Sequence, residues 1–333
     1  MKNILIILKK GLFFILFIVS SHDELTAQQT PIYSQYMLNG FLINPALAGV
    51  DGYQILNLIS RQQWVGYEDY PRTNWLSYQT RILKHRYLLR NLFGKKKYKP
   101  KTSGKIGFGA YLYNDRTGVI NRNGGQISYA YHTFINNKNT QLSLGISAQF
   151  YQMMFNRNQM ILSNDNDPFL NAVSNKNYFI PDFSVGANLL GKTYYFGITA
   201  AQLLQSKYII NGYQINGYNN PRIYYLLAGY TYYLNQNYVL EPSLLANVNE
   251  QFNYLATFTL KVTYNNTFWM GASVRTNKDI VYIIGFKYLF YYFSMAYDYP
   301  LTSLSSQNYG TYELSVSIKY GSSEKRLRWK ERY

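Results

Sequence analysis

Few residues of this chain are of the types that catalyse reactions or bind metals. The sequence has no cysteine, which excludes a thiolate nucleophile, a thiolate metal site, a disulfide framework and a lipid anchor on cysteine. Its three histidines, His22, His85 and His132, are scattered along the chain and offer little for a zinc site. Neither a serine nucleophile elbow nor a phosphate-binding loop occurs. The sequence therefore predicts no enzyme, no cofactor and no metal centre.

One short run resembles part of a calcium-binding loop. Asn164 and Asp165 begin the segment Asn-Asp-Asn-Asp-Pro, which is rich in the oxygen ligands that calcium prefers. The run lacks the glycine and the terminal glutamate of an EF-hand. We interpret it as a solvated loop, with bound calcium as the alternative.

The chain is strongly basic, with 33 Lys and Arg against 16 Asp and Glu, a net charge of +17. The basic residues crowd into two places, between Arg81 and Lys105 and between Lys325 and Arg332. No sequence signature of a nucleic-acid-binding module accompanies them. We therefore expect no nucleic-acid partner.

The first 27 residues have the pattern of a signal peptide. Lys2, Lys9 and Lys10 precede a short apolar run from Gly11 to Val19, and Ala27 is a suitable cleavage point. The apolar run is too short for a spanning helix, which needs about 20 residues. We predict a signal peptide over 1–27, and an N-terminal segment over 28–52 that lies in the periplasm or in the lumen of a barrel.

The remaining chain alternates apolar and polar residues with a period of two, which is typical of β-strands. From Gln141 to Tyr151, for example, one face carries Leu, Ile, Ala and Phe and the other carries Gln, Ser, Gly and Tyr. Most of these segments are long enough to cross a bilayer with tilt, and aromatic residues stand at their ends. A closed barrel satisfies every backbone group of such strands in lipid.

The sequence predicts an all-β protein: a single transmembrane antiparallel β-barrel over 53–320, followed by a basic tail over 321–333. The fourteen expected strands are 53–62, 72–82, 104–114, 124–135, 141–153, 181–190, 193–202, 222–234, 238–248, 254–264, 267–275, 280–288, 291–297 and 312–320.

Long and short connections alternate along much of this barrel. The long ones, Met154–Ile180, Leu203–Pro221 and Asp298–Thr311, fall on one rim, which is the extracellular rim of such barrels. They are rich in Tyr and Asn, which suit protein recognition. Candidate partner-binding residues there are Asn164, Asp165, Tyr208, Tyr213, Tyr218, Asn219 and Tyr309.

Both termini and the basic segment Lys84–Lys101 then lie on the periplasmic side. Its lysines form a cationic arm for an acidic periplasmic partner or for lipid phosphates. The residues assigned to this arm are Lys95, Lys96, Lys97, Lys99 and Lys101.

Several charged or polar residues on the strands suit the lumen rather than the lipid. Asp298 and the pair Asp115 and Arg116 would be destabilising against lipid, so we expect them to pair inside the barrel. His132 lies on the polar face of its strand and is expected to be hydrogen-bonded there.

The sequence resembles the PorP/SprF family at its mature N-terminus. The most specific blocks are Pro31 to Asn39, Asn44-Pro-Ala-Leu-Ala-Gly49 and Arg61-Gln-Gln-Trp-Val-Gly66. Shorter matches occur in order as far as Tyr299, so the resemblance covers essentially the whole mature chain. The family-motif residues are Ser34, Gln35, Tyr36, Asn44, Pro45, Gly49, Arg61, Trp64 and Gly66.

Three of these motif residues, Arg61, Trp64 and Gly66, have two possible roles. They could form a recognition surface, or they could close the first strand with an interfacial tryptophan and a turn glycine. We favour the second interpretation.

The resemblance implies an outer-membrane barrel of a Bacteroidetes-type bacterium that belongs to the type IX secretion system. It implies a role in the export or surface attachment of a specific large secreted protein through its C-terminal domain, and in some species a link to gliding motility. The implied partners are that secreted protein, periplasmic or outer-membrane components of the machinery, and the lipid bilayer. A passive porin or solute channel is the alternative function.

Overall fold

The computed structural model describes residues 33–82, 105–135, 140–155, 178–210, 213–219, 221–301 and 308–320. The signal-peptide prediction, the basic arm from Lys95 to Lys101, the run at Asn164 and Asp165, and the basic tail all lie outside these residues. Within them, no helix is long and apolar enough to cross a membrane.

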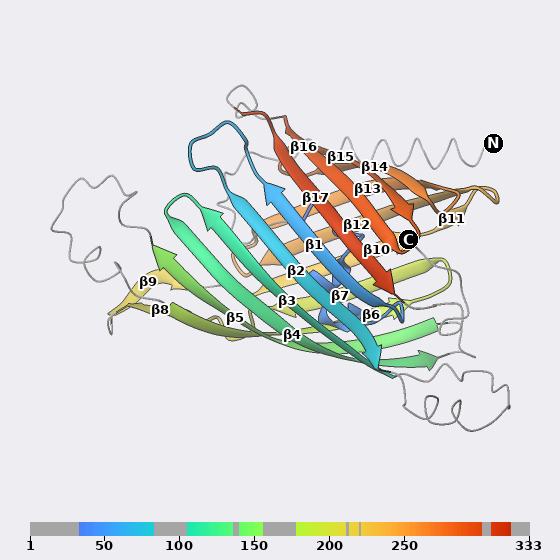
Figure 1. The fold of residues 1–333 in the computed structure, drawn as a ribbon. Helices are drawn as coiled ribbons and strands as arrows, with labels where there is room; N and C mark the ends of the chain where they lie inside the picture. The colour runs from blue at the N-terminus through green and yellow to red at the C-terminus, as the bar shows by residue number, and fades with distance from the viewer. Residues whose placement is uncertain are drawn as a thin grey trace.

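The chain forms a closed barrel of fourteen antiparallel strands (Figure 1). Strand β1 pairs with both β2 and β17, and β10 pairs with both β7 and β12, so the circle has no free edge. The barrel strands are β1 (Gln54–Gln62), β2 (Arg72–Ile82), β3 (Ile106–Thr117), β4 (Ile120–Ile135), β5 (Thr140–Phe155), β6 (Tyr178–Leu190), β7 (Tyr194–Ala201), β10 (Ile223–Tyr230), β12 (Tyr238–Asn249), β13 (Tyr254–Tyr264), β14 (Phe268–Arg275), β15 (Asp279–Tyr288), β16 (Tyr291–Pro300) and β17 (Thr311–Tyr320).

The alternation in the sequence becomes an apolar outer face and a polar lumen. On β5, Leu144 and Ile146 are 54% and 60% exposed on the outside, whereas Ser143 and Ser147 are buried inside. A soluble protein would bury the aliphatic face, so this inverted distribution is that of a barrel surrounded by lipid.

Three details differ from the strands that the sequence predicts. Strands β3 and β4 run on to a tight turn at Gly118, which has a φ of +55°. The polar run before this turn looks like a loop in the sequence, but the Asn114 amide hydrogen-bonds to Asn121 and Asn123 across the hairpin. These side-chain hydrogen bonds extend the pairing beyond the predicted strand ends.

The expected strand 222–234 is interrupted. Strand β10 ends at Tyr230, and only the short β11 (Tyr232–Tyr233) continues along β12. At the interruption, the backbone N–H of Thr231 donates to the carbonyl oxygen of Thr193, the residue before β7.

The connection Leu203–Pro221 is not the plain loop that its sequence predicts. It contains a hairpin of β8 (Lys207–Ile210) and β9 (Tyr213–Asn219), which form a separate two-stranded sheet. In Figure 1 this hairpin lies beyond the end of the barrel wall, next to β5. Tyr208, Tyr213, Tyr218 and Asn219 all belong to it.

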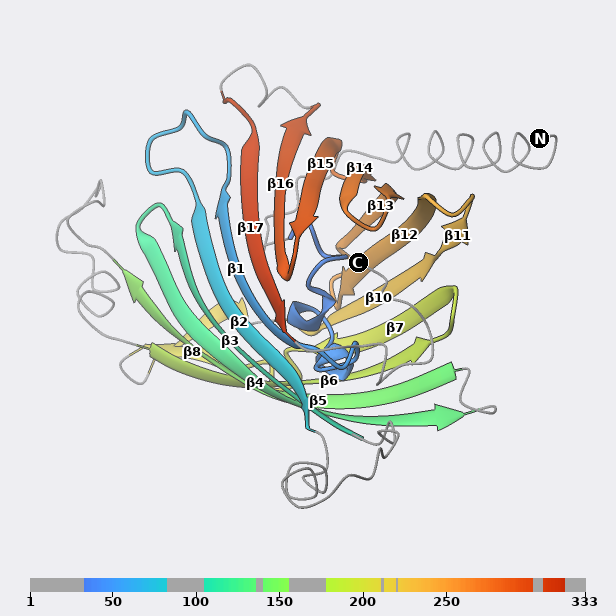
Figure 2. The ribbon, with the colours of Figure 1, turned by 45° about the vertical axis from the view of Figure 1, so that its right-hand side comes forward.

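The barrel has two rims, which we name by their connections. The long-loop rim carries the β1–β2, β5–β6, β7–β10 and β16–β17 connections, and the short-turn rim carries the opposite strand ends. The three long connections that the sequence places together therefore do share one rim. Figure 2 shows the segment after Tyr33, in blue, inside the ring of strands.

Candidate functional site: the plugged lumen

The residues before β1 form a compact plug within the barrel. The plug, residues 33–52, contains two single-turn 3₁₀ helices, η1 (Gly40–Leu42) and η2 (Pro45–Leu47). Asn44 caps η2 by accepting the backbone N–H of Ala46, and Pro45 suits the first helical position because it lacks an N–H. Tyr36, Phe41 and Ala46 are at most 1% exposed, so the plug is packed like a protein core.

A buried cluster of ions fastens the start of the plug to the barrel. Asp298 on β16 accepts from Arg61 on β1 and from Arg275 on β14, each at 2.9 Å. Glu313 on β17 lies 3.2 Å from Arg61. All four side chains are at most 4% exposed, so each charge depends on its partners for the stabilisation that water would otherwise supply.

The plug residue Ser34 lies at the centre of this cluster. Its hydroxyl contacts Asp298 at 2.7 Å and also accepts from both guanidinium groups. Its backbone N–H and that of Gln35 donate to the two oxygens of the Glu313 carboxylate. The motif residues Ser34, Gln35 and Arg61 therefore act together, as plug and wall of one ionic lock.

The sequence favoured the interpretation that Arg61, Trp64 and Gly66 close the first strand, and for Arg61 this is wrong. It lies next to the end of β1, as expected, but its side chain points into the lumen rather than closing the strand at the membrane surface. Trp64 follows β1 with a positive φ of 56° and is half-buried, and Gly66 has a φ of +113° in the same turn. The turn interpretation holds for Gly66, because this backbone conformation favours glycine.

Further hydrogen bonds hold the plug to other parts of the wall. The Tyr36 hydroxyl contacts Ser243 and Thr259, on β12 and β13, at 2.9 and 3.0 Å. On β6 and β7, the backbone carbonyls of Ala187 and Ile198 accept from the Asn44 side-chain amide. Together with the lock on β1, β14, β16 and β17, these contacts fix the plug from several directions.

The His132 side chain also contacts the plug. Its two ring nitrogens lie 2.7 Å from the hydroxyl of Ser143 and 2.9 Å from the carbonyl oxygen of Ala48. This confirms the expected hydrogen-bonded lumen histidine.

Glycines on the lumen side of the wall make room for the plug. A Cβ atom on Gly145 would lie 2.3 Å from the backbone nitrogen of Ala46, and one on Gly186 would lie 2.1 Å from the Asn44 side-chain oxygen. On β3, a Cβ on Gly107 would lie 1.9 Å from the carbonyl oxygen of Ala48. A side chain at these positions would clash with the plug, so glycine lets the wall backbone lie close to it.

The outer face over Gly145 and Gly186 is concave. A cavity of about 960 Å³ opens there toward the lipid, and its lining is mainly aliphatic and aromatic. Its lining includes Leu144, Ile146, Val185, Ala187 and Ile198.

The lumen contains a second ion pair. Lys261 on β13 lies 3.1 Å from Glu241 on β12, and both are buried. The Tyr195 hydroxyl also donates to Glu241. Asp115 accepts from the Thr73 hydroxyl at 2.7 Å inside the barrel, but its expected companion Arg116 points outward to Asp69 at the rim.

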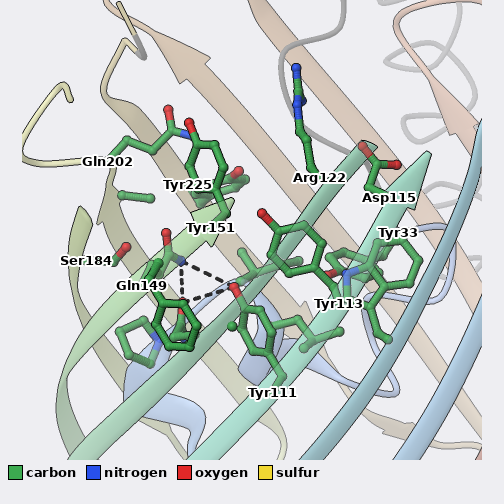
Figure 3. Close-up of a pocket in the computed structure, with 18 of the residues that line it drawn as sticks. Tyr33, Tyr111, Tyr113, Asp115, Arg122, Gln149, Tyr151, Ser184, Gln202 and Tyr225 are labelled. Atoms are coloured by element: carbon green, nitrogen blue, oxygen red, sulfur yellow. Dashed lines mark hydrogen bonds between the residues drawn. The ribbon is translucent and has the colours of Figure 1, made fainter. Parts of the chain in front are cut away.

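Between the plug and the long-loop rim lies a cavity of about 140 Å³, which we call the cup. Plug residues Leu42, Ile43 and Pro45 form its floor. Figure 3 shows tyrosines from several strands around it, with Arg122 and Asp115 on one side and Gln202 on the other. Its tyrosines are Tyr33, Tyr111, Tyr113, Tyr151 and Tyr225.

Some polar groups of the cup bind one another. The Tyr111 hydroxyl donates to Gln126 at 3.1 Å, and Gln149 donates to both of them (Figure 3). Others have no hydrogen-bond partner among the described residues, namely Arg122 Nε, Ser184 Oγ and Gln202 Oε1. The described residues contain no group of three His, Asp or Glu that could hold a metal ion.

The described candidate partner-binding residues lie in two connections of the long-loop rim. Tyr309 is 72% exposed, and its ring packs on Gly66, while its backbone pairs with Val65. The other tyrosines and Asn219 belong to the β8–β9 hairpin.

Sequence reasoning did not foresee the ionic lock as a unit. It identified Asp298 as a lumen charge but gave no role to Glu313 or Arg275. The signal lay in the sequence nonetheless, because both occupy polar faces of strands in a chain with only 15% charged residues.

The sequence model of the family described as type IX secretion system membrane protein PorP/SprF matches residues 25–318. This chain belongs to the PorP/SprF family. The family and the barrel place the protein in the outer membrane. The plug and the lock contain seven of the nine motif residues, so in this member most of the N-terminal blocks describe how the lumen is filled.

Solved structures with similar folds are bacterial outer-membrane barrels. The Pseudomonas putida toluene transporter TodX has 9% identity and a TM-score of 0.47, with 84% of this chain and 92% of that chain covered. The Ralstonia pickettii toluene transporter TbuX has 10% identity and a TM-score of 0.45, with 88% and 95% covered. No curated protein matches the sequence.

Proposed function

We propose that this PorP/SprF protein assists the export or surface attachment of one large secreted protein, which it recognises through that protein's C-terminal domain. The family supplies the setting, a type IX secretion system in the outer membrane. We further propose that the protein has a link to gliding motility and that it catalyses no reaction. It takes the long-loop rim as extracellular and the basic arm as periplasmic.

The main support for the proposal is that the plug is bound to the wall inside the barrel. A passive porin needs a continuous aqueous lumen, whereas here residues 33–52 are packed inside the barrel and bound to strands on several sides. The ionic lock adds buried charges that would be costly to separate. A barrel built in this way supports a protein-binding role better than solute passage.

The long-loop rim provides the surface for such a partner. The β8–β9 hairpin projects there with three tyrosines. Tyrosine gives large contact area at low entropic cost, and asparagine gives adaptable hydrogen bonds.

The test replaces residues 207–219 with a Gly-Ser linker in the natural host. We expect a folded barrel in the outer membrane and the loss of one specific secreted protein from the cell surface. The matched control is Leu289→Ser on the short-turn rim, where Leu289 is 67% exposed, and it should leave attachment unchanged. Continued attachment together with reduced solute uptake would favour the porin.

A deletion of the whole gene separates a dedicated partner from a general component. Loss of a single substrate supports the proposal, and loss of every type IX substrate assigns the protein to the core machinery. Planar-bilayer recordings of the purified barrel add an independent measurement, because a porin conducts without any partner.

The basic arm has its own test. Replacing Lys95, Lys96 and Lys97 with Glu should release periplasmic machinery components from the purified barrel while the secreted protein stays bound. Unchanged co-purification would remove the arm from the proposal.

A further inference from the structure

The cup is closed on one side by the plug. Leu42, Ile43 and Pro45 form its floor, so the side of the cup away from the plug is directed toward the long-loop rim. With a volume of about 140 Å³, the cup suits one inserted group rather than a polymer in transit.

Three residues that line the cup each have a buried polar side-chain atom without a hydrogen-bond partner among the described residues. Ser184 is only 3% exposed, and its hydroxyl makes no hydrogen bond within the described part of the chain. The same holds for the Gln202 side-chain oxygen and for Arg122 Nε. Buried polar atoms in native proteins are nearly always paired, so three such atoms around one cavity indicate a ligand or ordered water.

The remaining surface of the cup favours a ligand over water alone. The rings of Tyr33 and Trp75 pack at a tilt of 49° with their centroids 4.5 Å apart, and four further tyrosines line the cup. Gly124 leaves space for two of them, because a Cβ there would lie 2.5 Å from the Tyr113 ring and 2.7 Å from Tyr151 Cβ. Gln126 and Gln149 are already engaged with Tyr111, whereas the three unpaired atoms remain for a ligand.

We propose that the cup binds a short peptide segment of a protein partner, inserted from the long-loop rim. An apolar or aromatic side chain of the segment lies among the tyrosines. Its backbone carbonyl oxygens accept from Arg122 and Ser184, and its backbone N–H donates to Gln202. A peptide supplies alternating donors and acceptors beside a side chain, which is the combination these groups require. The inference rests on the proposed function, since it names where the secreted protein is held.

The test is site-specific photo-crosslinking in living cells, with the full-length protein. The probe is p-benzoylphenylalanine placed at Tyr225 in the cup, and the control position is Phe252, a rim residue that is 84% exposed. Mass spectrometry should find one discrete segment of the secreted protein attached at position 225 and absent at position 252.

The outcomes separate the cup from the proposed function. Crosslinks from position 225 only to this chain's own residues, to lipid or to glycan would overturn the peptide inference. Capture of the secreted protein from position 252 alone would overturn the cup and leave the proposed function intact. Capture from neither position would count against both.

A matched pair of variants isolates the hydrogen bond of Ser184. Threonine and valine have nearly the same shape, and only threonine keeps the hydroxyl. We expect Ser184→Val to reduce crosslinking at position 225 about 3- to 10-fold and Ser184→Thr to preserve it. Equal yields in two variants with the same thermal stability would show that the hydroxyl binds no ligand.

Discussion

Arg61 Nη2 lies 2.9 Å from Asp298 Oδ2, although the two residues are 237 positions apart in the sequence. The pair joins β1 to β16 across β17, and Ser34 of the plug contacts both side chains. One buried contact therefore links barrel closure to the position of the plug.

Loss of the Arg61 charge should destabilise the barrel strongly. Arg61→Met leaves Asp298 and Glu313 with reduced compensation in a buried site, and breaking such a pair costs about 3–5 kcal/mol. Urea unfolding in lipid vesicles measures the change. The control is Arg116→Met, which removes a pair that is exposed at 46% and 43% and should cost about 0–1 kcal/mol. Equal effects of the two substitutions would contradict the ionic lock.

A side chain at position 145 should displace the plug. Gly145→Val places atoms where the backbone of Ala46 now lies, and overpacking of this kind costs about 1–3 kcal/mol. We expect persistent channels in planar bilayers, where the wild type stays closed. Ala148→Val, on the outer face of the same strand, is the matched control and should remain closed. Channels in both proteins, or in neither, would show that this contact does not hold the plug.

The barrel could be predicted from the sequence because alternation is a local property. Each strand, such as the one containing Leu144 and Ile146, carries its own pattern of outward and inward residues, and the fourteen strands result from the repetition. The β8–β9 hairpin was missed because its polar and tyrosine-rich residues lack a clear apolar face. The extension of β3 was missed because Asn114 and its neighbours look like turn residues until their hydrogen bonds are known.

The site was less accessible to sequence reasoning because its residues come from distant segments. Ser34, Arg61 and Asp298 each belong to a recognisable block, but nothing local says that they meet. Their contact depends on the closure of β1 on β17 and on the plug turning back into the lumen. The glycines that admit the plug are likewise inconspicuous until Gly145 is seen against Ala46.

A charged residue should destabilise the folded barrel on its lipid-facing outer surface and have little effect at the rim. Ile146 is 60% exposed on the outside of β5, and Ile146→Arg near the bilayer midplane should cost about 2–4 kcal/mol. Phe252→Arg, on a rim residue that is 84% exposed, should cost close to nothing. Vesicle unfolding of both variants makes the comparison. A small effect at Ile146 would mean that this face contacts protein or water rather than acyl chains.

The last strand should direct assembly of the barrel. Strand β17 closes the circle by pairing with both β1 and β16, and its final residue Tyr320 is 70% exposed on the outer face. Tyr320→Asp replaces an interfacial aromatic with a charge at the point where closure is completed. We expect this variant to be absent from the outer-membrane fraction, as measured by fractionation and by surface protease accessibility.

The basic tail is the rival signal for assembly, because it also carries an aromatic residue, Tyr333. Its positive charges make the segment from Lys325 to Arg332 unsuited to crossing lipid, so deletion of 321–333 should leave insertion intact. Tyr288→Asp, on an outer-face residue that is 65% exposed at the same rim, controls for a general effect of a charge there and should insert at near wild-type level. Normal insertion of Tyr320→Asp with failure of the deletion would assign the signal to the tail, whereas failure of both aspartate variants would show that this rim tolerates no charge.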